Sequence, residues 1–290
     1  MADFKKILVI GGAGFIGSYL VNNLAAQSGL KLAVIYHEDL PKESQLPGVS
    51  YHQMDLTNAP DEFSTLVNSS DCVVSLATPN ISLIENLVAS IKLSGSKKIV
   101  YTSTMLVYPD SEKRHSETVG PQPETKYEKD KVAEEQVLMK FVGTSKTRVC
   151  IARLGNVYGD VKNRGLIGYI MLALKNSSVL TINGQGEHRR DYIFVQDVVN
   201  LLEFLIFYPQ QSELEIFNIC SGQDYTINEV IAVAEKIAGQ KIKKVYSKPI
   251  KEKLSVIGNN RKILNVSGYQ LKYDLVAGLQ QAYHNYSAKG

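Results

Sequence analysis

Residues 6–17 read KILVIGGAGFIG, in which five strand-like residues are followed at once by three spaced glycines at 11, 14 and 17. Gly11 allows a tight turn, Gly14 lets backbone amides approach a pyrophosphate, and Gly17 lets the next helix pack closely on the strand. Because the motif follows an expected strand and opens an expected helix, it predicts a dinucleotide-binding loop.

Beyond this loop, short apolar runs alternate with helical periodicity. The expected strands are 6–10, 31–36, 49–54, 72–76, 98–102 and 148–154; the expected helices are 16–27, 61–68, 81–93, 126–142, 167–175, 195–207, 227–238 and 273–285. The strand residues are nearly all apolar, which is typical of strands covered on both faces. We expect an α/β fold of Rossmann type, with a doubly wound parallel sheet and a smaller mixed α/β C-terminal lobe.

The composition changes after about residue 155, where Gly and Asn become frequent, as in GNVYGDVKNRGLIG at 155–168. This change predicts two domains. An NAD(P)-binding domain takes residues 1–155 together with about 188–210, and a nucleotide-sugar-binding lobe takes 156–187 and 211–290.

Composition excludes several classes of protein. The net charge of the 290 residues is only +3, and the basic residues are scattered, so neither nucleic acid nor a membrane surface is an expected partner. No apolar stretch approaches the roughly 20 residues of a membrane span. Cys72, Cys150 and Cys220 lie far apart in apolar runs, which predicts buried free thiols, no bound metal and a cytoplasmic location.

The end of the second expected strand bears on cofactor choice. An acid there would bind the ribose 2′-hydroxyl of NAD, whereas its absence would tolerate the 2′-phosphate of NADP. The aligned residue is His37, or Tyr36 with a shift of one residue, while Glu38 and Asp39 would serve if the strand ends later. The cofactor therefore stays open between NAD and NADP, with a slight preference for NADP. Asp55, after the third strand, is placed to meet the adenine.

A tyrosine and a lysine supply the expected chemistry. Tyr127 and Lys131 are four residues apart on the expected helix 126–142 and share one face. A nearby ammonium favours tyrosinate, and lowering the tyrosine pKa by roughly three units needs about 4 kcal/mol. Tyr127 is then the catalytic acid/base, and Lys131 can also bind the nicotinamide ribose. Ser103 and Thr104 end the fifth strand with hydroxyls that can bind the substrate oxygen.

Several longer blocks accompany these residues. They are GGAGFIG at 11–17, YTSTMLVY at 101–108, ARLGNVYG at 152–159, RRDYIFVQDV at 189–198 and LNVSGYQLKYDLVAGL at 264–279. With them the chain resembles, over nearly its whole length, the extended short-chain dehydrogenases/reductases, the family of UDP-galactose 4-epimerase and NDP-sugar 4-ketoreductases. The block at 189–198 is the most specific, because the shorter members of the superfamily lack it.

The resemblance implies roles by position. Thr104 becomes the active-site hydroxyl with Ser103 beside it, while Asn156 and Arg190 become ligands of the substrate's sugar or phosphates, for which a guanidinium is well suited. Thr78 is implied to touch both cofactor and substrate. The remaining implied cofactor contacts are Phe15, Ile16, Leu56, Leu76, Ala77 and Leu154.

Departures from the family narrow the reaction. Related 4,6-dehydratases carry Asp-Glu directly after the active-site threonine and related decarboxylases keep the glutamate, whereas this chain has Met105 and Leu106. The resemblance therefore implies C4 epimerisation of a nucleotide-diphosphate sugar. The alternative is an NAD(P)H-dependent NDP-4-keto-6-deoxysugar reductase, and a third possibility is a catalytically weak dinucleotide-binding redox sensor. A homodimer is implied by analogy.

Overall fold

The computed structural model describes residues 4–38, 40–58, 61–91, 97–162, 165–249 and 252–288. Contacts divide the chain into two compact units. Unit 1 comprises Met1–Val107, Thr125–Arg153 and Val199–Phe217, and unit 2 comprises Tyr108–Glu124, Leu154–Val198 and Asn218–Gly290. Segments 108–124 and 188–198 thus belong to unit 2, although the sequence-based boundaries assign them to the first domain.

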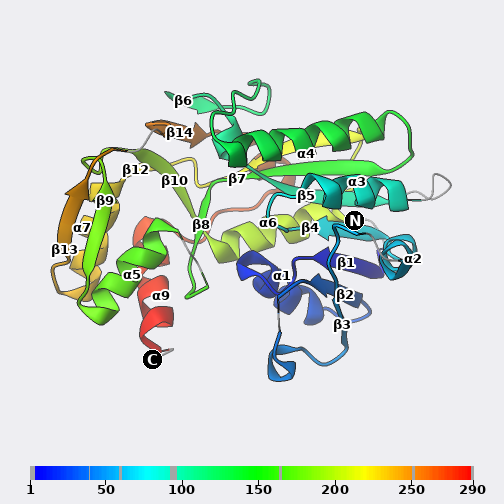
Figure 1. The fold of residues 1–290 in the computed structure, drawn as a ribbon, viewed down its shortest axis with the longest axis horizontal. Helices are drawn as coiled ribbons and strands as arrows, with labels where there is room; N and C mark the ends of the chain where they lie inside the picture. The colour runs from blue at the N-terminus through cyan, green and yellow to red at the C-terminus, as the bar shows by residue number, and fades with distance from the viewer. Residues whose placement is uncertain are drawn as a thin grey trace. The chain divides into compact units, whose positions relative to one another are not determined.

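Unit 1 is built on a seven-stranded sheet (Figure 1). Its order is β11 (Leu214–Ile219), β7 (Arg148–Leu154), β5 (Lys98–Thr104), β4 (Cys72–Ser75), β1 (Lys6–Ile10), β2 (Lys31–Tyr36) and β3 (Val49–Gln53). β1 pairs in parallel with both β2 and β4. The chain therefore leaves β1 in one direction and returns on its other side, and ligands of such sheets bind at the carboxyl ends of the strands near this switch point. The predicted doubly wound α/β fold is confirmed.

Helices cover both faces of this sheet. Three helices, α2 (Asp61–Ser69), α3 (Ile81–Ser90) and α4 (Lys126–Val142), lie side by side and bury their apolar residues against the β1 and β5 side chains. Alternate strand residues point to opposite faces, so the other face needs its own cover. There α1 (Phe15–Ala25) lies beside α6 (Val195–Phe207), and Gln27, just after α1, donates a 2.6 Å hydrogen bond to Glu203.

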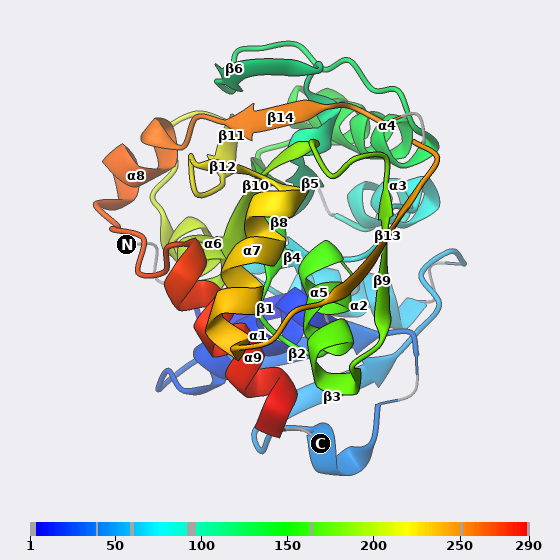
Figure 2. The same ribbon diagram turned by 90° about the vertical axis from the view of Figure 1, so that its left-hand side faces the viewer.

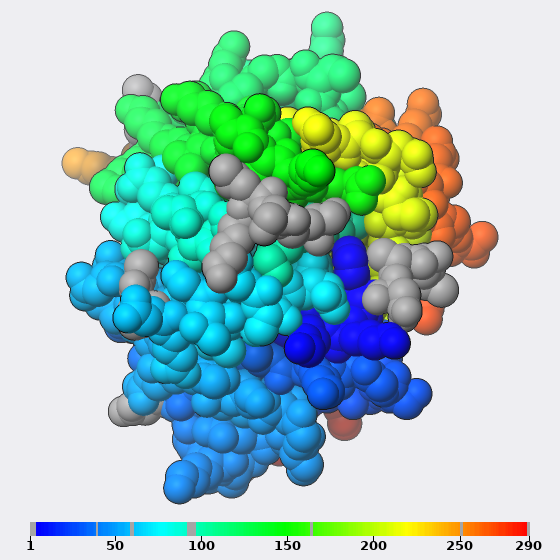
Figure 3. Space-filling view, turned by 90° about the vertical axis from the view of Figure 1, so that its right-hand side faces the viewer, coloured from blue at the N-terminus to red at the C-terminus, as the bar shows by residue number. Residues whose placement is uncertain are grey.

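The start of β1 is fixed by a carboxylate from a neighbouring part of the sheet. Asp71, which precedes β4, accepts hydrogen bonds from the amides of Lys5 and Lys6, each at 2.9 Å. In Figure 3 the blue N-terminal residues accordingly border cyan residues of the same unit. This anchoring ties the start of β1 to the residue that precedes β4.

Unit 2 contains a mixed sheet. Its strands are β12 (Asp224–Thr226), β10 (Arg189–Phe194), β14 (Ser255–Gly258) and β6 (Ser111–His115), with β8 (Asn156–Tyr158) also paired to β10. β12 is antiparallel to β10, whereas β8 and β14 are parallel to it. A separate pair, β9 (Val179–Asn183) and β13 (Lys243–Ser247), runs in parallel.

The helices of unit 2 are α5 (Leu166–Asn176), α7 (Ile227–Ala238), α8 (Arg261–Ser267) and α9 (Leu275–Ala288). α5, α7 and α9 contact one another, as Figure 2 shows. α7 opens with a capping box of Thr226 and Glu229, as the sequence pattern predicts. The three cysteines are buried, and none of them forms a disulfide. Among the described helices of the chain, none combines the length and apolarity needed to cross a membrane.

Candidate active site

The glycine loop joins β1 to α1 in a conformation that glycine alone provides. Gly11 has φ +78°, in the left-handed region, and its amide donates to the carbonyl of Ile35 at 2.8 Å. A Cβ on Gly17 would stand 2.3 Å from the Gly11 carbonyl oxygen and 2.7 Å from Gly12 Cα. The close approach of helix and strand predicted from the spacing is therefore present in unit 1.

The N-terminus of α1 is open to an anion. Its N-cap, Gly14, is exposed, makes no side-chain capping bond, and no acid lies in the first turn. Free amides at a helix N-terminus together with the helix dipole bind phosphate groups. Phe15 and Ile16, the first residues of the helix, are half-buried. This cradle fits the pyrophosphate of a dinucleotide, and the residues that would hold it are those of the loop.

The carboxyl end of β4 borders the same loop. The amide of Leu76 donates to Ile10 at 3.0 Å, and a Cβ on Gly11 would lie 3.1 Å from the amide nitrogen of Ala77. Leu76 and Ala77 are half-buried, and Thr78 is exposed. The structure thus brings the implied β4 residues next to the glycine turn.

The ends of β2 and β3 carry the residues that bear on the adenosine half. His37 is exposed, and its carbonyl accepts a hydrogen bond from Gln53 at 3.2 Å. Asp55 is also exposed and accepts from both the hydroxyl and the amide of Thr57, which, with His37 nearby, hold the pKa of its carboxyl below the usual value. Leu56 is buried. Asp39 lies outside the described residues.

Thr104 and Tyr127 meet at the carboxyl end of β5. Thr104 is the last residue of β5, and Tyr127 lies in the first turn of α4, whose start is fixed by the predicted capping box of Thr125 and Glu128. The Thr104 hydroxyl lies close to the Tyr127 phenol, which is 45% exposed. Partial burial raises the pKa of Tyr127, while the nearby Thr104 hydroxyl lowers it. The Tyr127 phenol is therefore fixed in position by α4 and still accessible to a substrate.

Ser103, the residue before Thr104 in β5, has an orphaned hydroxyl. Its side chain is only 4% exposed, and its oxygen has no hydrogen-bond partner within the described part of the chain. A buried hydroxyl without a partner costs free energy unless a ligand satisfies it. The orphan therefore fits a site that is completed by a bound molecule.

Lys131 is buried, which its spacing of four residues from Tyr127 does not by itself predict. Its ammonium is 3.1 Å from the Tyr101 hydroxyl, 3.1 Å from the Thr102 carbonyl oxygen and 3.3 Å from Glu134 Oε2. Burial lowers the pKa of Lys131, and Glu134 opposes that effect. Sequence reasoning misses Tyr101 and Glu134, although an acid three residues after the lysine on a helix face already known to be functional is the available signal.

In unit 2, the side chains of Asn156 and Arg190, which the family resemblance implies bind substrate, form hydrogen bonds to other protein groups. Asn156 donates to the carbonyl of Asp191 at 3.2 Å. The Arg190 guanidinium donates to the carbonyls of Lys253 at 2.7 Å and Leu254 at 3.1 Å, and also pairs with Glu252. These bonds fasten the segment before β14 to β10. Leu154 ends β7 and is 7% exposed.

Asp191, an acid of the block at 189–198, has a structural role. Its carboxylate accepts from the Ser221 amide and hydroxyl and from the Gly222 amide, at 2.7–2.8 Å. Burial raises the pKa of Asp191 to about 6 despite these three donors. The acid ties β10 to the turn at 221–222 and is therefore structural.

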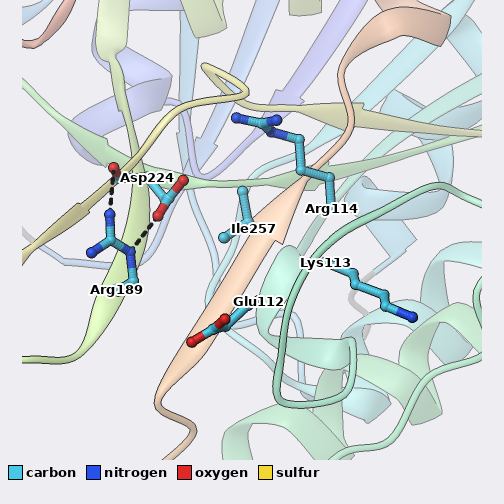
Figure 4. Close-up of a pocket in the computed structure, with 6 residues that line it drawn as sticks. All are labelled: Glu112, Lys113, Arg114, Arg189, Asp224 and Ile257. Atoms are coloured by element: carbon cyan, nitrogen blue, oxygen red, sulfur yellow. Dashed lines mark hydrogen bonds and ion pairs between the residues drawn. The ribbon is translucent and has the colours of Figure 1, made fainter.

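Unit 2 also holds a cavity of about 570 Å³, lined by Glu112, Lys113, Arg114, Arg189, Asp224 and Ile257 (Figure 4). Arg189 is paired with Asp224, and Lys113 points away from the other side chains. Arg190 is not among the lining residues, because neighbouring strand residues point to opposite faces. No residue predicted from the sequence lines this cavity. No group of three or more His, Cys, Asp and Glu side chains that could hold a metal ion occurs among the residues that the structure describes.

Comparisons with known proteins agree with this geometry. The profile of the NAD dependent epimerase/dehydratase family matches residues 7–220. The dTDP-4-dehydro-6-deoxyglucose reductase of Escherichia coli is 26% identical over 265 residues, covering 80% of this chain and 82% of the relative. A putative UDP-glucose 4-epimerase of Methanocaldococcus jannaschii is 26% identical over 305 residues, covering 95% and 96%.

Among solved structures, UDP-glucuronic acid 4-epimerase from Bacillus cereus, in complex with UDP-glucuronic acid and NAD, has the same fold. The TM-score is 0.88 at 23% sequence identity, and the match covers 98% of this chain and 100% of that chain. At this identity the likeness describes the fold.

Proposed function

Because this chain belongs to the NAD-dependent epimerase/dehydratase family, as its match over residues 7–220 shows, we propose that it is an NAD(P)-dependent nucleotide-sugar 4-epimerase. The observation that carries the proposal is the placement of the half-exposed Tyr127 phenol, in the first turn of α4, close to the Thr104 hydroxyl at the end of β5. It presents a proton donor and acceptor at the carboxyl end of β5, in the same sheet as the glycine loop. The substrate is a sugar linked to a nucleoside diphosphate.

The residues of this chain would act on the C4 hydroxyl of the sugar. The Thr104 hydroxyl binds the C4 oxygen, and Tyr127 takes the hydroxyl proton and later returns it to the same oxygen. Bound NAD(P) supplies the hydride acceptor and donor for the transient oxidation at C4. Lys131 supplies the positive charge that favours the tyrosinate. Ser103 offers its free hydroxyl to the substrate or the cofactor.

The residues after Thr104 support epimerisation over elimination. Met105 and Leu106 follow it in a short 3-10 turn, Met105–Val107, and Met105 is buried. Neither side chain can donate or accept a proton. A 4,6-dehydratase or a decarboxylase needs an acid at this point, so we do not assign those reactions.

For the cofactor we propose NAD or NADP, with a slight preference for NADP. The described end of β2 carries Tyr36 and then the exposed His37 in place of a carboxylate. An imidazole repels a 2′-phosphate less than an acid does. The same feature favours the second candidate, an NADPH-dependent 4-ketoreductase. We also propose that the protein is a cytoplasmic homodimer, and the absence of any disulfide among its three cysteines supports the compartment.

The decisive experiment replaces Tyr127 with phenylalanine. Turnover on a panel of UDP-, dTDP-, GDP- and CDP-sugars should fall by about 10²–10⁴-fold, because general acid–base catalysis is lost, while dinucleotide binding stays near that of the wild type. The control is Tyr246→Phe, since Tyr246 is a tyrosine of unit 2 with the same 45% exposure. Undiminished turnover in Tyr127→Phe would refute the assignment of Tyr127 as the catalytic acid/base.

The nucleotide that copurifies with the protein separates the two enzymatic candidates. An epimerase returns its hydride and needs no external reductant, so it should retain oxidised cofactor. A reductase should release its cofactor and consume added NADPH. The same assays with NAD and NADP compare the two cofactors directly.

A further inference from the structure

A buried carboxylate stands beside the proposed catalytic pair. Glu134 lies on α4, three residues after Lys131, and is 2% exposed. Its Oε1 accepts the Asn80 amide at 2.6 Å, at the start of α3, and its Oε2 accepts the Tyr101 hydroxyl and lies 3.3 Å from Lys131 Nζ. A carboxylate this deep is stable only if such partners satisfy it.

The bonds to Lys131 use the whole donor capacity of its ammonium. An ammonium has three N–H donors, and Glu134, the Tyr101 hydroxyl and the Thr102 carbonyl provide three acceptors. The same ammonium lies 4.8 Å from the centre of the Tyr101 ring. The Tyr127 hydroxyl is not among its hydrogen-bond partners in the described residues. Any action of Lys131 on Tyr127 therefore has to pass through its electric field.

We propose that Glu134 is a positioning residue, which holds the Lys131 ammonium beneath β5 and offsets part of its positive field at Tyr127. Glu134 thereby sets the pH range in which the tyrosine works. This inference rests on the proposed function of Tyr127. It adds to the Tyr–Lys pair a third charged group, fixed to the end of β5 through Tyr101 and to the start of α3 through Asn80.

Few other charged groups face this cluster. From α4 they are Tyr127 and Glu135, and from β5 the Tyr101 phenol. α3 has one charged residue, Glu85, which is exposed. Glu135 is engaged elsewhere, since both of its oxygens bind Arg153, at 3.0 and 2.6 Å. Within the described residues, Glu134 is the one carboxylate that forms an ion pair with Lys131, at 3.3 Å.

The direction of the effect follows from charge. Loss of the Glu134 charge removes an anion that stabilises the Lys131 ammonium and opposes ionisation of Tyr127, so both groups should lose their protons at lower pH. In Glu134→Gln the whole pH profile of kcat/KM should move toward acid by about one unit. Glu134→Asp retains the charge and should stay nearer to the wild-type profile.

The matched control is Glu135→Gln, which removes a neighbouring carboxylate of α4 that is equally buried. It leaves Arg153 without its ion pair and should destabilise the protein, yet the limbs of its pH profile should stay within a few tenths of a unit of the wild type. An unshifted profile in folded Glu134→Gln, or an equal shift in both Gln variants, would overturn the inference.

A second readout needs no substrate. The Lys131 Nζ resonance, assigned in ¹H–¹⁵N spectra by its loss in Lys131→Met, should titrate about one pH unit lower in Glu134→Gln than in the wild type. An unchanged titration would reject the role of Glu134 whether or not the enzyme turns over. Conversely, the wild type could turn over no sugar nucleotide while Glu134→Gln still lowers the pH at which Lys131 titrates. That result would refute the proposed function alone.

Discussion

Gly17 offers the sharpest test of the cofactor loop. In Gly17→Ala the new Cβ would stand 2.3 Å from the Gly11 carbonyl oxygen and 2.7 Å from Gly12 Cα, and both atoms belong to the backbone. Restoring ordinary contact requires the loop and the helix to separate by roughly 1 Å. Such overpacking costs about 1–3 kcal/mol, of which the better helix propensity of alanine returns up to about 1 kcal/mol.

The displaced loop carries the amides that would bind the pyrophosphate, so affinity should fall together with stability. We expect a melting temperature lower by about 3–6 °C and dinucleotide affinity weaker by about tenfold, measured by thermal denaturation and isothermal titration with NAD and NADP. Gly120→Ala is the control, because a Cβ at Gly120 meets nothing within 4 Å. Wild-type affinity and stability in Gly17→Ala would show that the glycine loop is not the dinucleotide site.

Two further predictions concern unit 2. Burial alone would raise the pKa of Glu235, but Lys241 and Lys244 help lower it to about 2, so its carboxylate stabilises the fold above pH 4.5 and loses that contribution as the pH falls toward 2. In urea denaturation Glu235→Gln should cost about 1–2 kcal/mol at pH 7, allowing for solvent screening, and this difference should fade in acid; a constant difference would contradict the linkage. Gly278→Ala would place a Cβ 2.0 Å from the Tyr158 hydroxyl and should cost about 1–3 kcal/mol by thermal denaturation. Adding Tyr158→Phe should recover part of that loss, and no recovery would locate the strain elsewhere.

The helix that carries Tyr127 illustrates how far sequence reasoning reaches. Helix 126–142 is predicted with its observed bounds, because the capping box at Thr125 and the spacing of its apolar residues are local signals. The roles of its two adjacent acids are not local. Glu134 forms an ion pair with Lys131, and Glu135 forms one with Arg153. The second pair depends on β7 packing against α4.

The hydrogen-bond partners of Arg190 could not be predicted from the sequence. Its place in a specific sequence block implies phosphate binding, yet its guanidinium is bonded to the segment before β14. That segment is more than 60 residues away in the sequence, and no periodicity or motif relates it to β10. Long-range polar pairing of this kind becomes visible only when the strands are assembled.

The glycine loop, the alternation of strands and helices, and the helix caps can all be predicted from the sequence, because each depends on backbone conformation or apolar spacing within a few residues. Which polar groups meet depends on how the layers pack. Asp71 binds the amides at the start of β1, and the Tyr101 hydroxyl donates to Glu134. Lys131 is enclosed by Tyr101, Glu134 and the Thr102 carbonyl of β5, where the packed layers exclude water. Burial makes an unpaired charge costly, so these partners are selected by the fold.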